Sequence, residues 1–340
     1  AGPPSEHIRE THGRTEQSGP GRGADPVTFR STPESPIDAS SRGVPLFQRI
    51  TIIGLGLIGG SVGLACRARR LAIEVRGADH DPDHRAQAIA LGCVGEAFED
   101  SAAAIDGADL VVLAIPVGEI PRVIQGIAPH LPPGAVVTDV GSVKGPVAAA
   151  MERLLPGGKA VPGHPIAGRE LSGPMAASAE LFVGAKCVLT PIPTTDPVAL
   201  ERVRGLWTAI GADVLEMSPE RHDEIFAAIS HLPHIVAYAL MGTILDLSED
   251  GEDLHEFAAG GLKDFTRVAM SHPVMWRDIC LANRQQILEM IRRFQSALSQ
   301  LMSMISAEDG EGLYRQFARA RTAREAVGRV KGAGNRTRSD

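Results

Sequence analysis

Three glycines at fixed spacing, Gly54, Gly56 and Gly59, follow the β-branched run Ile50–Ile53 and precede an Ala/Leu-rich segment. A strand, a G-x-G-x-x-G turn and a helix in this order form a phosphate-binding loop, because N–H groups at the helix N-terminus face the anion. Gly54 allows the tight turn, Gly56 lets the backbone approach the phosphates, and Gly59 lets the helix pack on the strand. The residues expected to contact the ligand are Gly54, Gly56, Leu57, Ile58 and Gly59.

An aspartate follows this loop at the spacing that a dinucleotide site requires. Asp79 lies roughly 20 residues after Gly59, at the end of the next expected strand. An acid at this position binds the hydroxyls of the adenosine ribose, and its charge repels a 2′-phosphate. The next residues, His80-Asp81-Pro82, contain no arginine that could bind such a phosphate. The loop and Asp79 therefore predict a site for NAD rather than NADP.

Two further segments place polar groups where strands are expected to end. Asp139-Val-Gly-Ser142-Val-Lys144-Gly145 follows an apolar strand at the edge where open α/β sheets bind ligands, although a polar turn would look similar. Gly163-His164-Pro165 contains a histidine, which titrates near neutral pH and can accept a proton from a hydroxyl. His164 is therefore a candidate general base, although a histidine before a proline is more often structural.

The carboxyl-terminal part contains candidate substrate-binding groups. Arg267, in Gly260-Gly-Leu-Lys-Asp-Phe-Thr-Arg267, could bind a carboxylate through two hydrogen bonds, or it could pair with Asp264 three residues earlier. In Ser230-His-Leu-Pro-His234, a proline interrupts an apolar helix beside two histidines. We expect no metal there, because no third ligand is nearby.

The elements that position these residues follow from the pattern of apolar runs. Between Ile50 and Met217, short β-branched runs alternate with helical stretches, which predicts a parallel sheet with crossover helices. The expected strands are Ile50–Ile53, Ile73–Ala78, Leu110–Ile115, Val136–Val140, Ala160–Val161, Lys186–Thr190 and Asp213–Glu216. Ser218 as N-cap and Pro219 at the first helical position begin a region that is helical almost to the end.

The last long helix has an apolar seam in steps of three and four residues. Its members are Ile287, Ile291, Phe294, Leu298, Leu301 and Ile305. Such a seam packs against another helix, either in a partner subunit or within the same domain, and the spacing leaves both possibilities open.

Composition limits the classes of protein that this chain can belong to. With 340 residues, of which 44% are hydrophobic and 22% charged, it is a globular protein of two domains. The net charge of -7 makes nucleic acid an unsuitable partner. Four scattered cysteines indicate neither disulfides nor zinc. We find no apolar run of roughly 18 residues and no secretory signal, so we expect a cytoplasmic protein without a membrane partner.

Taken together, these segments resemble the prephenate and arogenate dehydrogenase family of tyrosine biosynthesis, from Ile50 to about Ala326. The motifs are I-I-G-L-G-L-I-G-G-S, D-V-G-S-V-K, G-H-P-I-A-G, H-L-P-H, and G-G-L-K-D-F-T-R with M-W-R-D. The resemblance implies a Rossmann-like, doubly wound α/β domain followed by an all-α dimerisation domain, with the active site between them. We therefore expect a disordered tail (1–46), an NAD-binding domain (47–217), a helical substrate and dimerisation domain (218–327) and a second disordered tail (328–340).

The resemblance also implies a reaction, the NAD-dependent oxidative decarboxylation of prephenate to 4-hydroxyphenylpyruvate. His164 matches the catalytic histidine, and Ser142 matches a serine that hydrogen-bonds this histidine and the substrate hydroxyl. Arg267 matches the arginine that binds the side-chain carboxylate of the substrate. The other matching pocket positions are His234, Ser230, Trp276 and Glu170.

Three alternatives remain at this point. The substrate could be arogenate, or both compounds, because the two differ only by a keto group against an ammonium and Glu170 could contact an amine. A β-hydroxyacid dehydrogenase would use a helical lysine, for which Lys263 is the candidate. A non-catalytic NAD sensor would keep the fold with a damaged proton-transfer set, whereas His164, Ser142 and Arg267 are all present.

Overall fold

The computed structural model describes residues 2, 44–155, 157–169, 171–248 and 254–329. Most of the two tails predicted to be disordered, 1–46 and 328–340, lies outside these residues, and so does Glu170.

The large sheet has six parallel strands in the order β3-β2-β1-β4-β5-β6, which is the Rossmann order. Its strands are β1 (Phe47–Ile53), β2 (Ala72–Ala78), β3 (Glu96–Phe98), β4 (Leu110–Leu113), β5 (Val136–Asp139) and β6 (Ala160–Val161). The fold class predicted from the sequence is confirmed. The three-residue strand β3 was missed, because so short a segment shows no periodicity.

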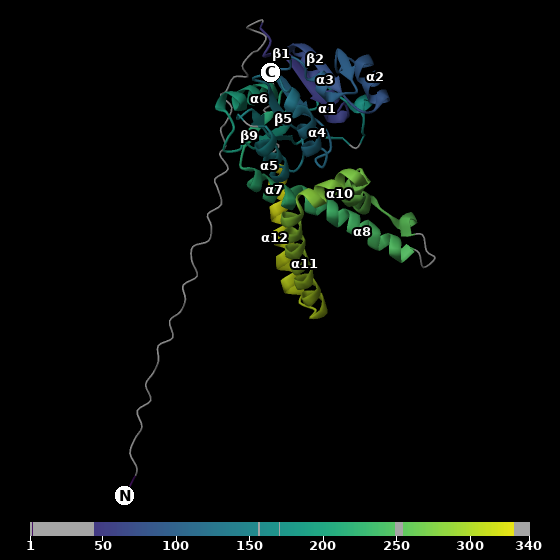
Figure 1. Ribbon diagram of the computed structural model, residues 1–340. Coiled ribbons are helices and arrows are strands. Elements are labelled where there is room, and N and C mark those ends of the chain that lie inside the picture. Colours follow the sequence, from purple (N-terminus) through teal and green to yellow (C-terminus); the bar gives the residue numbers. More distant parts are fainter. Residues whose placement is uncertain (1, 3–43, 156, 170, 249–253, 330–340) are drawn as a thin grey trace, which may run out of the picture.

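Helices cover both faces of this sheet (Figure 1). They are α1 (Leu57–Ala68), α2 (Pro82–Ala90), α3 (Ser101–Ala104), α4 (Ile120–Ile127), α5 (Gly145–Leu154) and α6 (Pro197–Ala209), with short 3-10 helices at Ala128–His130 and Pro174–Ala176. Ile50 and Ile52 of β1 face one core, with α1 and α6, whereas Val111 and Leu113 of β4 face the other, with α4 and α5. The alternation follows from the period-two geometry of a strand.

A second sheet of three strands corrects the expectation that all strands form one parallel sheet. Its order is β7-β8-β9, where β7 (Gly163–Pro165) is antiparallel to β8 (Lys186–Leu189) and β8 is parallel to β9 (Asp213–Glu216). Pro162 separates β6 from β7 and has no N–H with which to continue the parallel ladder. Instead its carbonyl accepts a hydrogen bond from Thr190, and the chain crosses to β8. His164 therefore lies in the middle of a strand that the sequence did not predict.

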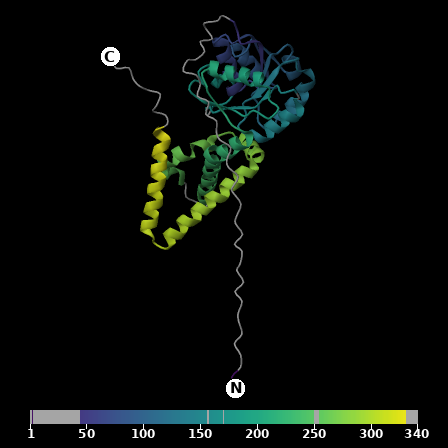
Figure 2. The same ribbon diagram turned by 90° about the vertical axis from the view of Figure 1, so that its left-hand side faces the viewer.

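The helical part begins where the sequence indicates, since the Ser218 hydroxyl accepts a hydrogen bond from the Arg221 N–H and Pro219 is the first helical residue. Its helices are α7 (Pro219–Phe226), the π-helical turn η4 (Ala227–His231), α8 (Leu232–Ser248), α9 (Gly260–Thr266), α10 (Pro273–Ala282), α11 (Arg284–Ser306) and α12 (Gly310–Arg329), with 3-10 helices at Leu254–Phe257 and Arg267–Met270. Trp276 and Ile279 of α10 join the core that contains Val117 and Ile120, which anchors this part on the sheet domain. Helices α11 and α12 extend away from the sheet and turn back on each other (Figure 2).

The sequence analysis found no apolar run long enough to cross a membrane, but the structure contains one helix that passes this test. Residues Pro219–Leu247 form a continuous helix of 29 residues with a window of mean hydropathy 1.5, long and apolar enough by length and composition to cross a membrane. Contrary to the prediction from the sequence, Pro233 does not interrupt this helix: the π-helical turn η4 lies just before it and the helix continues. Only 22% of the window is buried within the chain. A core helix passes the same test of length and composition, so this is weak evidence for a membrane span.

Candidate active site

The glycine loop lies where the strand order reverses, between β1 and β4. Gly54 has a φ of 96°, and a Cβ there would lie 2.3 Å from the carbonyl oxygen of Ala114, just after β4. A Cβ on Gly59 would lie 1.9 Å from the carbonyl oxygen of Gly54, whereas a Cβ on Gly56 would meet nothing within 4 Å. The first and third glycines are thus required by the chain itself. The second leaves open space at the N-terminus of α1, where an anion can approach the backbone.

Asp79 is buried directly beside this loop. One carboxylate oxygen accepts the N–H of Leu55 at 2.8 Å, and the other accepts the N–H of Asp81 at 3.0 Å. Two histidines face the carboxylate, with the Nδ1 of His80 at 3.3 Å and that of His84 at 3.5 Å. The acid is therefore oriented by the loop, and each of its oxygens retains a lone pair for a ribose hydroxyl.

A buried ion pair joins the end of β5 to the start of β7. Asp139 and Lys144 are both fully buried and hydrogen-bonded to each other, and the Lys144 ammonium also donates to the carbonyl of Gly163 at 2.7 Å. Asp139 accepts the N–H of Gly141 at 2.7 Å and that of Gly163 at 3.1 Å. Burial raises the pKa of the Asp139 carboxyl and lowers the pKa of the Lys144 ammonium, while their mutual attraction opposes both shifts. Ser142 and His164 each follow a glycine held by Asp139, so this pair positions both segments.

His164 makes a hydrogen bond that the sequence analysis did not predict. Its Nδ1 lies 2.8 Å from the Nε2 of His222, whose Nδ1 lies 2.8 Å from the Oδ1 of Asp223. His222 is fully buried, and its ring stacks on Phe226 at a centroid distance of 4.4 Å. Asp223 also accepts the N–H groups of Lys144 and Gly145, each at 2.8 Å, and so caps the N-terminus of α5.

The surroundings keep the histidines of this cluster neutral. Burial lowers the pKa of His164 well below its usual value, and the nearby His222, Lys144 and His231 lower it further. Burial, followed by Lys144 and His231, lowers the pKa of His222 to about 2. At neutral pH, His164 is therefore an uncharged imidazole that can accept a proton.

A second group of predicted residues lies across the helical part. The rings of His234 and Trp276 stack at 3.8 Å, and His231 meets the edge of Trp276 at 6.0 Å. Burial lowers the pKa of His234, a hydrogen bond to the Ser230 carbonyl opposes this shift, and the charge of Arg267 lowers the pKa further. Arg267 is exposed, and its charge lies close enough to His234 to affect the pKa of that imidazole. Asn283 links the two groups, since its amide donates to the carbonyl of Asp223 at 2.9 Å and lies 3.2 Å from the Nδ1 of His231.

Other predicted residues are placed less directly. Ser142 is half-buried, and among the described residues the hydrogen bond of His164 goes to His222 rather than to Ser142. Ser230 contributes its carbonyl, which accepts from the Nδ1 of His234 at 2.9 Å, rather than its hydroxyl. The prediction for Glu170 falls outside the described residues. Lys263, the candidate of the β-hydroxyacid alternative, is exposed on α9.

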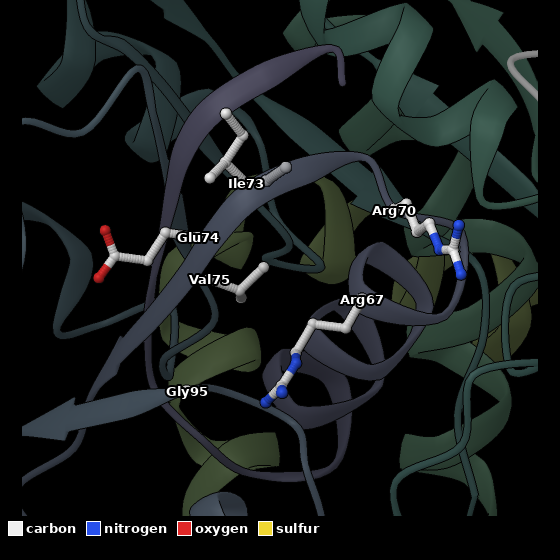
Figure 3. A pocket seen from close by; sticks show the side chains of 7 residues that line it. Arg67, Arg70, Ile73, Glu74, Val75 and Gly95 are labelled. Carbon is white, nitrogen blue, oxygen red and sulfur yellow. The ribbon is translucent and has the colours of Figure 1, made fainter. Parts of the chain in front are cut away.

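Two features lie apart from this cluster or were missed by sequence reasoning. A shallow hollow lies at the far end of α1, between Arg67, Arg70 and Gly95 (Figure 3), and contains no residue of the predicted site. In the described ranges, no group of three or more His, Cys, Asp or Glu residues is arranged to hold a metal ion. His222 and Asp223 were missed. The available signal was that His222 lies three residues after Pro219 and four before Phe226, on a face that the structure buries.

Family models match most of the chain. The model described as the nucleotide-binding domain of prephenate dehydrogenase matches residues 62–216, and the model of its dimerization domain matches residues 218–319. A cyclohexadienyl dehydrogenase from Zymomonas mobilis is 36% identical over 83% of this chain and 97% of its own length. A prephenate dehydrogenase from Bacillus subtilis is 35% identical over 84% of this chain and 77% of its own length.

Solved structures give the same match. The prephenate dehydrogenase of Aquifex aeolicus, crystallised with hydroxyphenyl propionate and NAD+, superposes with a TM-score of 0.79 and 37% identity, covering 82% of this chain and 98% of the other. An arogenate dehydrogenase from Synechocystis has a TM-score of 0.69 and 31% identity, covering 82% of this chain and 99% of the other.

Proposed function

The chain belongs to the prephenate dehydrogenase family, and from that premise we propose that it oxidises and decarboxylates prephenate to 4-hydroxyphenylpyruvate with NAD. The observation that best supports this function is the neutral, half-buried His164 on β7, whose neighbour Gly163 is held by Asp139 at the end of β5, a strand of the sheet that carries the glycine loop. A proton acceptor and a dinucleotide loop are what a hydride-transfer enzyme requires.

The residues present fit the cofactor. The open space beside Gly56 and the free N–H groups at the start of α1 suit a pyrophosphate, and Asp79 suits the adenosine ribose. The loop residues Gly54, Gly56, Leu57, Ile58 and Gly59, with Asp79, remain our proposed NAD contacts. NAD, when bound, supplies the acceptor for the hydride.

The chain's own groups do the rest of the chemistry. The Nε2 of His164 accepts the proton of the ring hydroxyl as the carbon that bears this hydroxyl loses its hydride. The ring carboxylate then leaves as CO2, its bonding electrons enter the ring, and the oxygen regains the proton to give a phenol. Ser142 would orient the hydroxyl, and Arg267 would bind the side-chain carboxylate bidentately. Ser230, His234, Trp276 and Glu170 would complete the pocket.

The choice of substrate is the finer question. Relatives named cyclohexadienyl and arogenate dehydrogenase keep arogenate, or both compounds, as the second candidate. A steady-state comparison of prephenate and arogenate, each with NAD and with NADP, tests the choice. We expect the highest kcat/KM for prephenate with NAD; a higher value for arogenate would replace our proposal with the alternative, and a higher value with NADP would overturn the role given to Asp79.

We also propose that two copies form a homodimer through the helical part. The family model of this part describes a dimerization domain. Two members of the seam on α11 are uncovered within one chain, with Leu298 44% and Ile305 62% exposed, which argues against a seam buried wholly within its own domain. On α12, Tyr314 is 70% exposed. A partner copy would cover these side chains and the apolar helix Pro219–Leu247, and such a dimer fits a cytoplasmic enzyme. Sedimentation of Leu298→Glu should show monomers, and an unchanged dimer would remove the seam from the interface.

A further inference from the structure

The hydrogen-bond chain from His164 to Asp223 has a defined direction. A carboxylate only accepts hydrogen bonds, so the Nδ1 of His222, 2.8 Å from Asp223 Oδ1, must be protonated. Because His222 is neutral, with a pKa of about 2, its Nε2 carries a lone pair and accepts. The Nδ1 of His164, 2.8 Å away, must then be the donor. The remaining nitrogen of neutral His164, its Nε2, is left without a proton.

We propose that His222 and Asp223 are positioning residues that fix His164 in the one neutral tautomer able to act as base through Nε2. This inference rests on the proposed function for the identity of the base, but the tautomer itself is a property of the free protein. Either neutral tautomer of a free imidazole is accessible, and only the one with an unprotonated Nε2 can take a proton at that atom.

The direction of the chain depends on Asp223 being ionised; although burial leaves the pKa of Asp223 above its usual value, its hydrogen bonds support the charged form. Asp223 accepts two backbone N–H groups at the N-terminus of α5, where the helix dipole stabilises a negative charge. Burial raises the pKa of Asp223, while the hydrogen bonds from Lys144 and Gly145 and the charge of Lys144 lower it. The ammonium of Lys144 is itself held beside Asp139, so a positive charge stays close by.

The hydrogen-bond chain from His164 to Asp223 crosses from one part of the molecule to the other. His164 belongs to β7 of the sheet domain, whereas His222 and Asp223 belong to α7 of the helical part. Phe226 packs against both imidazoles, at 4.9 Å from His164 and 4.4 Å from His222, which keeps their rings in place. The base is therefore oriented only when the helical part is docked on the sheet domain.

The direct test is nitrogen NMR of the imidazoles in the intact protein at neutral pH, with and without NAD. We expect His164 to show a protonated Nδ1 and an unprotonated Nε2, and the opposite assignment would overturn the proposal. The measurement needs no turnover. If prephenate gives no NADH while the tautomer is as expected, the proposed function is wrong but the positioning role of His222 and Asp223 is supported.

Two variants of His222 separate orientation from packing. In His222→Gln, the amide oxygen can still accept from the Nδ1 of His164, whereas His222→Leu removes the acceptor. We expect His222→Leu to show mixed tautomers and a kcat lower by about 10²-fold, with KM for prephenate and Kd for NAD changed less than about 3-fold. His222→Gln should keep the tautomer and recover most of the kcat.

Equal losses of kcat in the two variants, or an unshifted tautomer in His222→Leu, would contradict a positioning role. If His222→Leu does not fold, His222→Phe replaces it, because its ring has a similar shape but offers no acceptor to the Nδ1 of His164. His222→Phe should show mixed tautomers of His164 and a lower kcat, and an unshifted tautomer in this variant would overturn the proposal.

Discussion

The two halves of the proposed active site are built in opposite ways. The cofactor half consists of backbone geometry within one short segment, where Gly54 and Gly59 are required by contacts of 2.3 and 1.9 Å that any side chain would make with the chain itself. The catalytic half consists of buried side chains from separate elements, since His164 comes from β7, His222 from α7 and Asp139 from the end of β5.

This difference determines how each half responds to change. A backbone loop fails through steric clash, because its ligand binds main-chain N–H groups whatever the neighbouring side chains are. A network of buried polar side chains fails when one partner is lost, because the other is then left without a hydrogen bond. The two halves can therefore be disabled separately.

The largest expected effect separates catalysis from cofactor binding. His164→Asn removes the proton acceptor, so kcat with prephenate should fall by about 10³-fold while the Kd for NAD stays within about 3-fold of the original. Stopped-flow measurement of NADH formation and fluorescence titration with NAD give the two numbers. Normal NADH formation by this variant would exclude His164 as the base.

A matched pair of glycine variants tests the cofactor half. Gly59→Ala places a Cβ 1.9 Å from a carbonyl oxygen, so it should lower the free energy of unfolding by more than about 3 kcal/mol. Gly56→Ala meets no atom of the chain, so it should unfold at the same denaturant concentration yet bind NAD at least about 10-fold more weakly. Full NAD affinity in Gly56→Ala would show that the backbone does not approach a phosphate there.

Arg267 provides a smaller test of the substrate contacts. Arg267→Lys keeps the charge but loses the two-pronged geometry, so KM for prephenate should rise by about 10-fold or more while kcat changes little. The control is the Kd for NAD, which should not change. A fall in kcat at constant KM would instead place Arg267 at the reacting centre.

The last effect concerns stability in acid rather than activity. Burial lowers the pKa of His222 from 6.5 to about 2, so the unfolded chain binds a proton there below 6.5 while the folded chain does not until the pH nears 2. Stability present above pH 6.5 is therefore lost as the pH falls, by about 2 kcal/mol at about pH 5 for this one group. Urea unfolding at about pH 7 and about pH 5 gives the free energy of unfolding at each pH. Between these pH values, it should fall by about 2 kcal/mol less in His222→Gln than in the unchanged protein. An equal loss in both proteins would show that His222 is protonated in the folded state.

Sequence reasoning succeeded where the signal is local. The glycine loop, Asp79 and the helix start at Ser218 depend on neighbours within a few residues, and seven of the strands coincide with β-branched or apolar runs. It failed for β7, which contains a glycine and a proline and pairs antiparallel with a strand more than 20 residues away in the chain.

The catalytic half was predicted only in part, because its geometry depends on packing between distant segments. The sequence indicated chemistry in the motif around Asp139, but not that Lys144 would be the buried partner of Asp139. The spacing of His222 from Pro219 and Phe226 indicated only a shared helix face, since its role appears only when α7 docks against β7 and brings its Nε2 to the Nδ1 of His164.

The central claim is the reaction itself, and product stoichiometry tests it most directly. Purified protein is incubated with NAD and prephenate while NADH, CO2 and 4-hydroxyphenylpyruvate are measured together. We predict equal amounts of the three products. NAD binding without NADH formation, or NADH formation without CO2, would contradict an oxidative decarboxylation of prephenate.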